Sequence, residues 1–477
     1  METVIILVFV FGYLAITLEH SIKIDKLIPA LVMMAICWAL IALGLDGFSE
    51  WFDSSKHGLV EGFKSMPLED QLNSAGEVIE RGKMHLMEET LLHHLGKTAE
   101  ILVFLLGAMT IVEIIDYFDG FSTIKSFIKT KKKIKILWIF AVLAFILSAI
   151  IDNLTATIVL ISILQKIVKD RDMRIWYAGL IIIAANAGGA WSPIGDVTTT
   201  MLWIGKKVTT SHLLIYLFLP SLVCMAVPTF IASFLPVFKG KLEVDDSIDE
   251  EPKSKFSSIM LYLGLGAIVF VPIFKTITHL PPYVGMMLSL GVVAIFAELY
   301  SSSKFSISSH DSEESDAHAS HSPVHSSLSK IELPSILFFL GILMGVAALE
   351  SLGILFNFAT TLKETMPMMG TEMHHEGVSD LVVLLLGVAS AVIDNVPLVA
   401  ASLGMFSEPI DNELWHFVAY SAGTGGSMLI IGSAAGVVAM GMEKIDFFWY
   451  LKKISWLALI GFLAGAVIFM FTRTIPL

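Results

Sequence analysis

The sequence has few charged residues for its length. Of its 477 residues, 16% are Asp, Glu, Lys or Arg, whereas a soluble protein has about 25%. It is also 55% hydrophobic, with a mean hydropathy of +0.77. Apolar runs of about 20 residues, the length that spans a bilayer, recur along the chain. This shortage of charge argues against two or three soluble domains and predicts an all-α polytopic membrane protein.

Cysteine is also scarce. Cys37 and Cys224 are the two cysteines, both in apolar stretches, so neither a disulfide framework nor a Cys-based metal site is predicted. No basic patch is mixed with aromatic residues, and we expect no nucleic-acid partner. The chain opens with Met1-Glu2-Thr3, which lacks the basic segment of a secretory signal. Residues 4–18 are therefore expected to belong to the first span rather than to a cleaved leader.

Ten membrane crossings are expected, with an internal repeat and two polar insertions. The crossings lie near 2–18, 27–45, 98–118, 175–204, 212–236, 257–278, 282–300, 334–356, 414–441 and 446–472. Residues 1–97 comprise N-terminal spans and a segment, around Leu86 to Leu95, whose apolar spacing suits a surface helix. The first repeat covers 98–238, connecting spans 239–300 and the second repeat 333–477. Residues 301–332, rich in Ser and His, are expected to form a disordered linker.

Two apolar stretches each carry one Asp-Asn pair near the midpoint, in matching contexts. Residues 148–153 read Ser-Ala-Ile-Ile-Asp-Asn, and residues 390–395 read Ser-Ala-Val-Ile-Asp-Asn. Asp152 is the only ionisable residue of 136–165, and Asp394 the only one of 381–407. A carboxylate in mid-membrane costs about 2.5–3.5 kcal/mol on insertion scales and usually marks an ion, proton or substrate path. The duplication predicts a transporter with its site at mid-membrane.

Flanking charges suggest how these two stretches enter the membrane. Lys and Arg residues lie on both sides of 136–165, whereas Glu and Asp lie on both sides of 381–407. Basic residues collect on the cytoplasmic side, and 30 residues cannot cross a bilayer twice. Each stretch is therefore expected to be a re-entrant hairpin with the Asp-Asn pair at its tip. The hairpins would enter from opposite sides, which makes the repeat inverted in topology.

A second matched element follows each hairpin. Residues 186–200 read Asn-Ala-Gly-Gly-Ala-Trp-Ser-Pro-Ile-Gly-Asp-Val-Thr-Thr-Thr, and residues 424–436 read Thr-Gly-Gly-Ser-Met-Leu-Ile-Ile-Gly-Ser-Ala-Ala-Gly. Glycine and proline destabilise a helix when they lie in its interior. Two broken transmembrane helices are therefore predicted over 175–204 and 414–441. The residues expected at the breaks are Gly188, Gly189, Pro193, Gly195, Gly425, Gly426 and Gly432, with Asp196 matching Ser433 in the alignment.

The side chains expected around these breaks offer only oxygen ligands. They combine the carboxylates of Asp152, Asp196 and Asp394 with the hydroxyls of Thr155, Thr198, Thr199 and Ser433 and the side chains of the asparagines. Asn153 and Asn395 are expected to cap the returning helices. Such a set suits a hard cation such as Na⁺ or Li⁺ rather than a soft metal. The alternative for the glycines and hydroxyls, close helix packing, stays open for Thr199, Thr200 and Ser427.

These motifs resemble the NhaD family of sodium/proton antiporters, within a superfamily that also contains dicarboxylate transporters. The resemblance covers about 98–472 and rests on both Asp-Asn tips and on the string from Asn186 to Thr200. It implies exchange of Na⁺ or Li⁺ for H⁺ in a bacterial inner membrane, a homodimer in lipid, and no cofactor. It also implies a site built from Asp152, Asn153, Asn186, Asp196, Thr198, Thr199, Asp394 and Asn395.

The function predicted is antiport by competition, with alternating access. A carboxylate removed from water holds its proton more tightly, so a proton and a cation can displace one another at the same buried site. One alternative is an Na⁺-coupled carrier of an anion such as a dicarboxylate or sulfate. A second is an intramembrane aspartyl protease, in which Asp152 and Asp394 would form a dyad; the nearest match to its Gly-x-Gly-Asp string, residues 193–196, lacks the first glycine.

Overall fold

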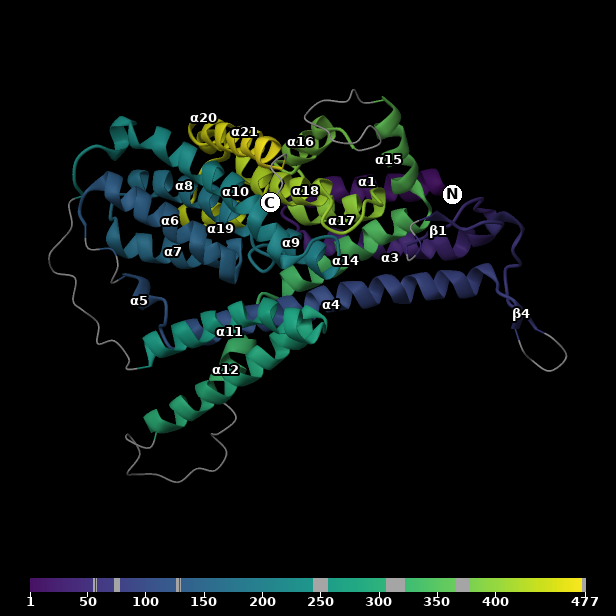
Figure 1. The fold of residues 1–477 in the computed structure, drawn as a ribbon, viewed down its shortest axis with the longest axis horizontal. Helices are drawn as coiled ribbons and strands as arrows, with labels where there is room; N and C mark the ends of the chain where they lie inside the picture. Colours follow the sequence, from purple (N-terminus) through teal and green to yellow (C-terminus); the bar gives the residue numbers. More distant parts are fainter. Residues whose placement is uncertain are drawn as a thin grey trace. The chain divides into compact units, whose positions relative to one another are not determined.

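In a computed structural model the described residues are mostly helical. The structure describes residues 1–54, 56, 58–72, 78–125, 128, 130–242, 256–305, 322–365 and 378–473. They fall into two compact units (Figure 1). The first comprises Met1–Leu102, Glu332–Val382 and Val396–Pro409, and the second comprises Val103–Ile331, Val383–Asn395 and Ile410–Leu477. Because α4 (Lys83–Tyr117), α16 (Asp380–Ala389) and α17 (Asn395–Met405) pass from one unit to the other, each contributes to both.

The first unit is built around α3 (Leu27–Gly44), which packs on α1 (Glu2–Thr17) and α14 (Leu333–Ser351). The indole Nε1 of Trp38 donates to the carbonyl of Met344 over 2.9 Å, which links α3 to α14. The unit also holds two short helices and two antiparallel strand pairs. These are α2 (Glu19–Ile22), α15 (Ile354–Thr365), β1 (Phe52–Asp53) with β2 (Gly58–Leu59), and β3 (Gln71–Leu72) with β4 (Val78–Glu80).

The second unit carries both matched motifs. Its first half contains α6 (Lys133–Ile151), α7 (Asn153–Ile167), α8 (Arg171–Gly189) and α9 (Val197–Ile204), and α6, α7 and α8 pack against one another. Its second half contains α18 (Glu413–Gly425) and α19 (Ala434–Glu443). The two halves interlock, because α19 packs on α7 and α8 while α18 packs on α8 and α9 (Figure 1).

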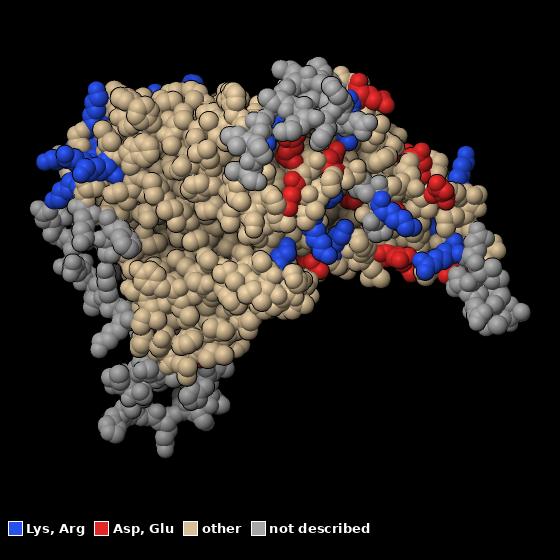
Figure 2. Space-filling model, in the orientation of Figure 1, with Lys and Arg blue, Asp and Glu red and all other residues tan. Residues whose placement is uncertain are grey.

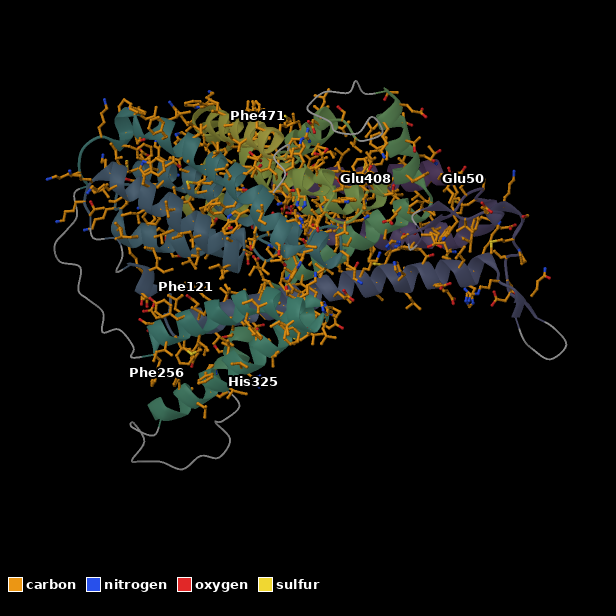
Figure 3. The ribbon with its side chains drawn as sticks, in the orientation of Figure 1. Glu50, Phe121, Phe256, His325, Glu408 and Phe471 are labelled. Atoms are coloured by element: carbon orange, nitrogen blue, oxygen red, sulfur yellow. The ribbon has the colours of Figure 1, made fainter. Side chains whose placement is uncertain are left out.

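The remaining helices surround this group. Helix α10 (Thr210–Ser233) packs along α21 (Ser455–Thr472), and α11 (Ser257–Thr278) packs along α12 (Pro282–Phe305). Phe256, labelled in Figure 3, stacks on Tyr300 of α12 with ring centroids 4.4 Å apart. Three short helices complete the unit: α5 (Ser122–Lys125), α13 (Pro323–Leu328) and α20 (Phe447–Lys453).

Eight of the described helices are long and apolar enough to cross a membrane. Each of the ten predicted crossings corresponds to helix, but 175–204 and 414–441 are interrupted, as α8–α9 and α18–α19. In the second unit, Lys and Arg gather at one end, and the broad face beside them carries little charge (Figure 2). The basic residues near the start of α6 and the end of α7 include Lys132, Lys133, Lys135, Lys166 and Lys169. This charge distribution is the one expected of helices that lie in lipid.

Three predicted boundaries differ from the structure. The segment around Leu86–Leu95 is not a separate helix, because α4 runs unbroken over 35 residues; the lone Gly96 costs about 1 kcal/mol, too little to end a helix. The predicted span 446–472 divides at Ile454 into α20 and α21, where Lys452 and Lys453 end the first piece. The expected linker is helical at both ends, to Phe305 and from Pro323, and its centre lies outside the described residues.

Candidate cation site

The first Asp-Asn pair forms a tight turn between α6 and α7. Asp152 has φ 80° and ψ 159°, a backbone conformation that residues other than glycine rarely adopt. Its carboxylate caps α7: Oδ1 accepts from the Thr155 amide over 2.8 Å and Oδ2 from the Thr155 hydroxyl over 2.9 Å. The prediction that Asn153 is the cap is therefore wrong. The same prediction for Asn395 is also wrong, because α17 already begins at that residue.

Since it is not needed as a cap, the Asn153 side chain points elsewhere. The residue is 6% exposed, and its amide Nδ2 donates to Asn186 Oδ1 over 3.0 Å and to Asp196 Oδ1 over 3.5 Å. The turn at Asp152 thus delivers an amide from the start of α7 to the break between α8 and α9. Thr155, whose hydroxyl binds Asp152, contributes to the turn rather than to this group.

The two predicted breaks are alike in local geometry. Helix α8 stops at Gly189 and α9 starts at Val197; helix α18 stops at Gly425 and α19 starts at Ala434. Asp196 and Ser433 occupy the N-cap positions of the two new helices with φ of −151° and −148°. The remaining predicted break residues, Gly188, Pro193, Gly195, Gly426 and Gly432, lie at the edges of these interruptions or within them. The alignment of Asp196 with Ser433 therefore describes equivalent places in the chain.

Matched contacts hold each break against the preceding hairpin tip. The Ser148 hydroxyl donates to the Ala185 carbonyl over 2.6 Å, and in the second copy Ser390 donates to Ala422 over 2.8 Å. A Cβ on Gly189 would lie 2.5 Å from the Gly195 carbonyl oxygen, and one on Gly426 would lie 2.5 Å from that of Gly432. Only glycine permits backbone to approach backbone this closely.

Asp196 is the carboxylate at the centre of the site. It is 3% exposed. Its Oδ2 accepts from the Asn395 amide over 3.0 Å and from the Thr198 hydroxyl over 2.6 Å, while Oδ1 faces Asn153 at 3.5 Å. The tip asparagines of both copies therefore meet at one acid. Every donor to this carboxylate in the described structure is a neutral amide or hydroxyl.

Asn186 joins the first break to the second. It is fully buried, and its Nδ2 donates to the hydroxyls of Ser427 and Ser433, each over 2.9 Å. Ser427, for which close helix packing is the alternative to a role in the site, belongs to this group. A signal was present, since Ser427 directly follows the Gly425-Gly426 pair; the alignment hid it because the matching residue of the first copy is Ala190.

The other predicted ligands lie around this centre. The Thr199 hydroxyl donates to the Asp196 carbonyl over 2.9 Å, so it holds the break. Asp152 and Asp394 are half-buried, and both are close enough to act on Asp196 through their charge. The structure thus makes Asp196, rather than the two tip aspartates, the acid on which the neutral donors converge.

The chemistry of this group is that of a site for a small hard cation or a proton. A buried carboxylate without a positive partner is costly. A proton would remove its charge, and a cation would balance it. The carboxylate, amide and hydroxyl oxygens nearby are ligands that hard cations prefer. The C-terminal end of the helix that enters each break carries partial negative charge, which also suits a cation.

Comparison with known proteins finds one matching family and several similar transporters. Residues 6–415 match the family described as citrate transporter. Sodium/proton antiporter 2 of Arabidopsis thaliana is 40% identical over 81% of this chain and 88% of its own length. The Na⁺/H⁺ antiporter NhaD of Vibrio parahaemolyticus is 32% identical over 76% of this chain and 87% of its own. Sodium/proton antiporter 1 of Arabidopsis thaliana is 45% identical over 79% of this chain, which spans 62% of that relative's length.

The fold and the relatives define a multi-pass membrane transporter. The chain belongs to the NhaD-type sodium/proton antiporter family, within the group that the citrate transporter description covers. The relatives' names indicate transport and give no support to the protease alternative. Because they come from a plant as well as from bacteria, they do not assign the chain to a bacterial inner membrane.

Proposed function

We propose that this protein exchanges Na⁺ or Li⁺ for H⁺ across a membrane, with cation and proton competing for the Asp196 site. The observation that carries the proposal is a buried carboxylate whose donors, among the residues that the structure describes, are all neutral. Because no Lys or Arg of this described part pairs with it, the carboxylate is proposed to be neutralised by an ion that comes and goes. A fixed Lys or Arg would have supplied that charge permanently and left no place for a transported cation.

In this competition, binding of either the proton or Na⁺ to the Asp196 carboxylate prevents binding of the other. When Asp196 is protonated, it no longer offers a charged ligand, and Na⁺ leaves. When Na⁺ binds the carboxylate with the hydroxyl oxygens of Thr198, Ser427 and Ser433 nearby, the proton has to leave. If neither the empty nor the doubly occupied carrier reorients, one flux requires the other. Asp152 and Asp394 strengthen this competition through their charge, because they attract either ion to the site.

Alternating access is proposed to follow from the repeat. In this account the hairpin tips and the broken helices belong to an inverted repeat, with the re-entrant hairpins entering from opposite sides. The matched contacts of Ser148 and Ser390 support the repeat, and the basic residues at one end of α6, α7 and α8 support the side of entry (Figure 2). The homodimer implied by the family resemblance belongs to the same proposal.

The test uses purified protein in lipid vesicles that carry an imposed pH difference, followed by a pH-sensitive dye. Addition of Na⁺ or Li⁺ is expected to collapse the pH difference, and K⁺ is expected to leave it unchanged. Vesicles with the Asp196→Asn variant serve as the control. No response to any of the three cations in the unmodified protein would remove the antiporter from consideration.

The second candidate function is an Na⁺-coupled anion carrier, favoured by the name of the matching family. An anionic substrate needs positive or strongly donating groups, and the Asp196 carboxylate opposes it by repulsion. The same vesicles separate the two functions. A carrier would accumulate a labelled dicarboxylate, citrate or sulfate when Na⁺ is added, without a proton flux. The antiporter is expected to move protons and none of these anions.

A further inference from the structure

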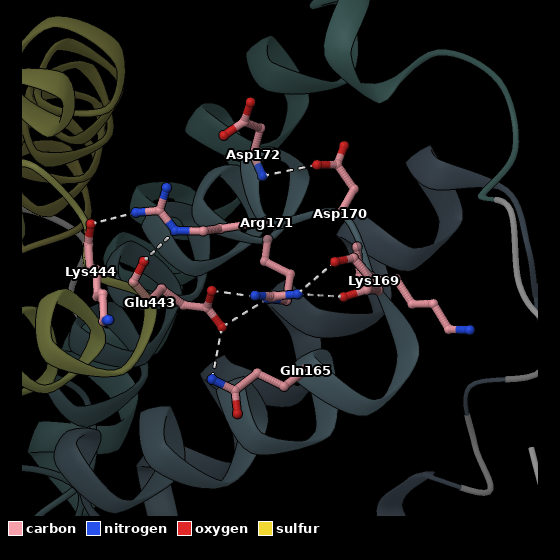
Figure 4. A network of polar contacts seen from close by, with 9 residues as sticks. Gln165, Lys169, Asp170, Arg171, Asp172, Glu443 and Lys444 are labelled. Carbon is pink, nitrogen blue, oxygen red and sulfur yellow. Dashed lines mark hydrogen bonds and ion pairs between the residues drawn. The ribbon is translucent and has the colours of Figure 1, made fainter.

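An ion pair links the two halves of the second unit. It lies at the ends of the site helices that are far from Asp196. Glu443, the last residue of α19, is 2% exposed although it is acidic. The Arg174 Nε of α8 donates to Glu443 Oε1 over 3.0 Å and to Oε2 over 2.9 Å, and Gln165 of α7 donates to Oε1 over 2.9 Å (Figure 4). One carboxylate therefore binds side chains from two other helices.

The same arginine and its neighbour also bind free helix ends. Arg174 Nη1 donates to the carbonyls of Val168 and Lys169, over 3.1 and 2.9 Å, just past the end of α7. Arg171 donates to the Glu443 carbonyl over 3.2 Å and to the Lys444 carbonyl over 2.7 Å, where α19 ends (Figure 4). The last carbonyls of a helix lack partners within it, so the two guanidinium groups fix where α7 and α19 stop.

The three helices joined here each contribute a residue to the candidate cation site at their other ends. Helix α7 begins at Asn153, α19 is capped by Ser433, and α8 leads to Asn186. At about 1.5 Å per residue, Gln165 lies about 18 Å along α7 from Asn153, and Glu443 lies about 15 Å along α19 from Ser433. Because a helix is stiff along its axis, a shift at Glu443 moves Ser433, and a shift at Gln165 moves Asn153.

We propose that Arg174 and Glu443 are positioning residues for cation binding. They set the axial register of α7, α8 and α19, so that Asn153 reaches Asp196 and Asn186 binds both Asn153 and Ser433. This inference rests on the proposed function, because it concerns the same site. It assigns a role in Na⁺ affinity to two residues that do not touch the ion and lie 269 positions apart in the chain.

The chemistry of Arg174 is specific. Its Nε binds the carboxylate while Nη1 binds two carbonyls, a fork that a lysine ammonium cannot reproduce with one nitrogen. Arg174→Lys keeps the charge and loses the carbonyl contacts. Glu443→Gln keeps the shape and loses the charge. The double variant Arg174→Gln with Glu443→Gln loses the ion pair without leaving either partner charged alone.

The experiment measures the apparent KM for Na⁺ and the maximal rate in vesicles for these variants, with thermal unfolding in detergent as the check on folding. We expect Glu443→Gln and Arg174→Gln each to raise KM by about fivefold or more, with a maximal rate close to that of the unmodified protein. The double variant is expected to be no worse than the worse single variant, because the two residues act as a pair. Glu89→Gln, which breaks an exposed pair with Arg81, is the control and is expected to change nothing.

Unchanged KM in correctly folded single variants, or purely additive effects in the double variant, would overturn the inference. If the Glu443 variants do not fold, Gln165→Leu tests the same point more mildly, since it removes one donor to the carboxylate without stranding a charge. A smaller rise in KM then supports the inference, and no rise overturns it. Failure of the unmodified protein to respond to Na⁺ at all would instead contradict the proposed function.

Discussion

The side-chain amide of Asn395 donates to Asp196 over 3.0 Å, across 199 positions of sequence. This contact brings the second hairpin tip to the first broken helix. Asn153 makes the corresponding approach from the first tip, at 3.5 Å. Two copies of one motif thus converge on an acid that only the first copy possesses, since the second copy carries Ser433 in its place. The two matched motifs thus meet in one group of side chains, in which the first copy contributes the acid Asp196 and the second contributes the neutral Ser433.

The first prediction concerns the charge of Asp196. Asp196→Asn keeps the size of the side chain and removes the negative charge that, in the proposed function, the transported ion neutralises. Removing one member of a buried charge pair costs about 3 kcal/mol or more, which is a factor of about 100 in rate. We expect Na⁺-driven proton flux in vesicles to fall by at least this factor, while the protein still folds and elutes as the unmodified protein does. Flux within a few-fold of normal would exclude Asp196 as the exchanging group.

The second prediction concerns the two tip amides. Asn153→Ala and Asn395→Ala each remove a donor to Asp196, and hydrogen bonds to charged groups contribute about 1.5–3 kcal/mol. We expect the apparent KM for Na⁺ to change by about tenfold or more, with Asn395→Ala the more severe because its contact is shorter. Asn357→Ala, which removes a contact to Glu50 on the surface, is the matched control. Equal KM values in all three variants would show that the amides do not act on the site.

The third prediction tests the close approach at the breaks. Gly189→Ala and Gly426→Ala each place a Cβ 2.5 Å from a carbonyl oxygen, so the break has to open. Overpacking of this kind costs about 1–3 kcal/mol, and thermal unfolding is expected at a lower temperature in both variants. Gly291→Ala in α12 has nothing within 4 Å of the new Cβ and is expected to unfold as the unmodified protein does. Equal unfolding temperatures across the three variants would contradict the matched geometry.

The fourth prediction separates the two roles of Asp152. Asparagine is as good a helix cap as aspartate, whereas alanine at a cap costs about 1 kcal/mol. Asp152→Asn is therefore expected to keep the unfolding temperature, because its amide oxygen can still accept from the Thr155 amide, and to weaken Na⁺ binding, because the charge is lost. Asp152→Ala is expected to do both. If Asp152→Asn binds Na⁺ normally, the tip aspartate serves the turn alone.

The fifth prediction is a pH dependence. If one proton and Na⁺ compete, the apparent KM for Na⁺ rises as the pH falls through the range in which the site takes up its proton, by up to about tenfold per pH unit. The maximal rate is expected to change less with pH where Na⁺ is saturating on the side from which it binds, because Na⁺ at that concentration displaces the proton. Rate measurements over a grid of pH and Na⁺ concentration check this. A KM that does not change with pH, together with a falling maximal rate, would argue for independent sites.

Much of the site could be predicted from residues that act on their own stretch of backbone. The glycine pairs and Pro193 destabilise a helix in any tertiary context, so both breaks lie where the sequence predicts them. Asp196 follows the first break directly, and a buried acid in an apolar segment is a strong signal by itself. These features need no knowledge of the tertiary structure.

The remainder depends on backbone angles and distant partners. The sequence does not reveal that Asp152 adopts φ 80°, and this angle decides that Asp152 caps α7 and that Asn153 faces the site. The pairing of Asn186 with Ser427 joins residues 241 positions apart, and the Arg174–Glu443 pair is as distant. From the sequence alone, Arg174 is interpreted as an ordinary flanking charge on the cytoplasmic side. The fold shows that it binds Glu443 at the end of α19.

Binding calorimetry of Na⁺ to the purified protein, in two buffers whose ionisation enthalpies differ, tests the account most directly. Displacement of a proton from Asp196 predicts an apparent binding enthalpy that changes with the buffer, in the direction of proton release. The change is expected to disappear in Asp196→Asn. Na⁺ binding with the same enthalpy in both buffers, and therefore with no proton released, would contradict competition at a shared carboxylate.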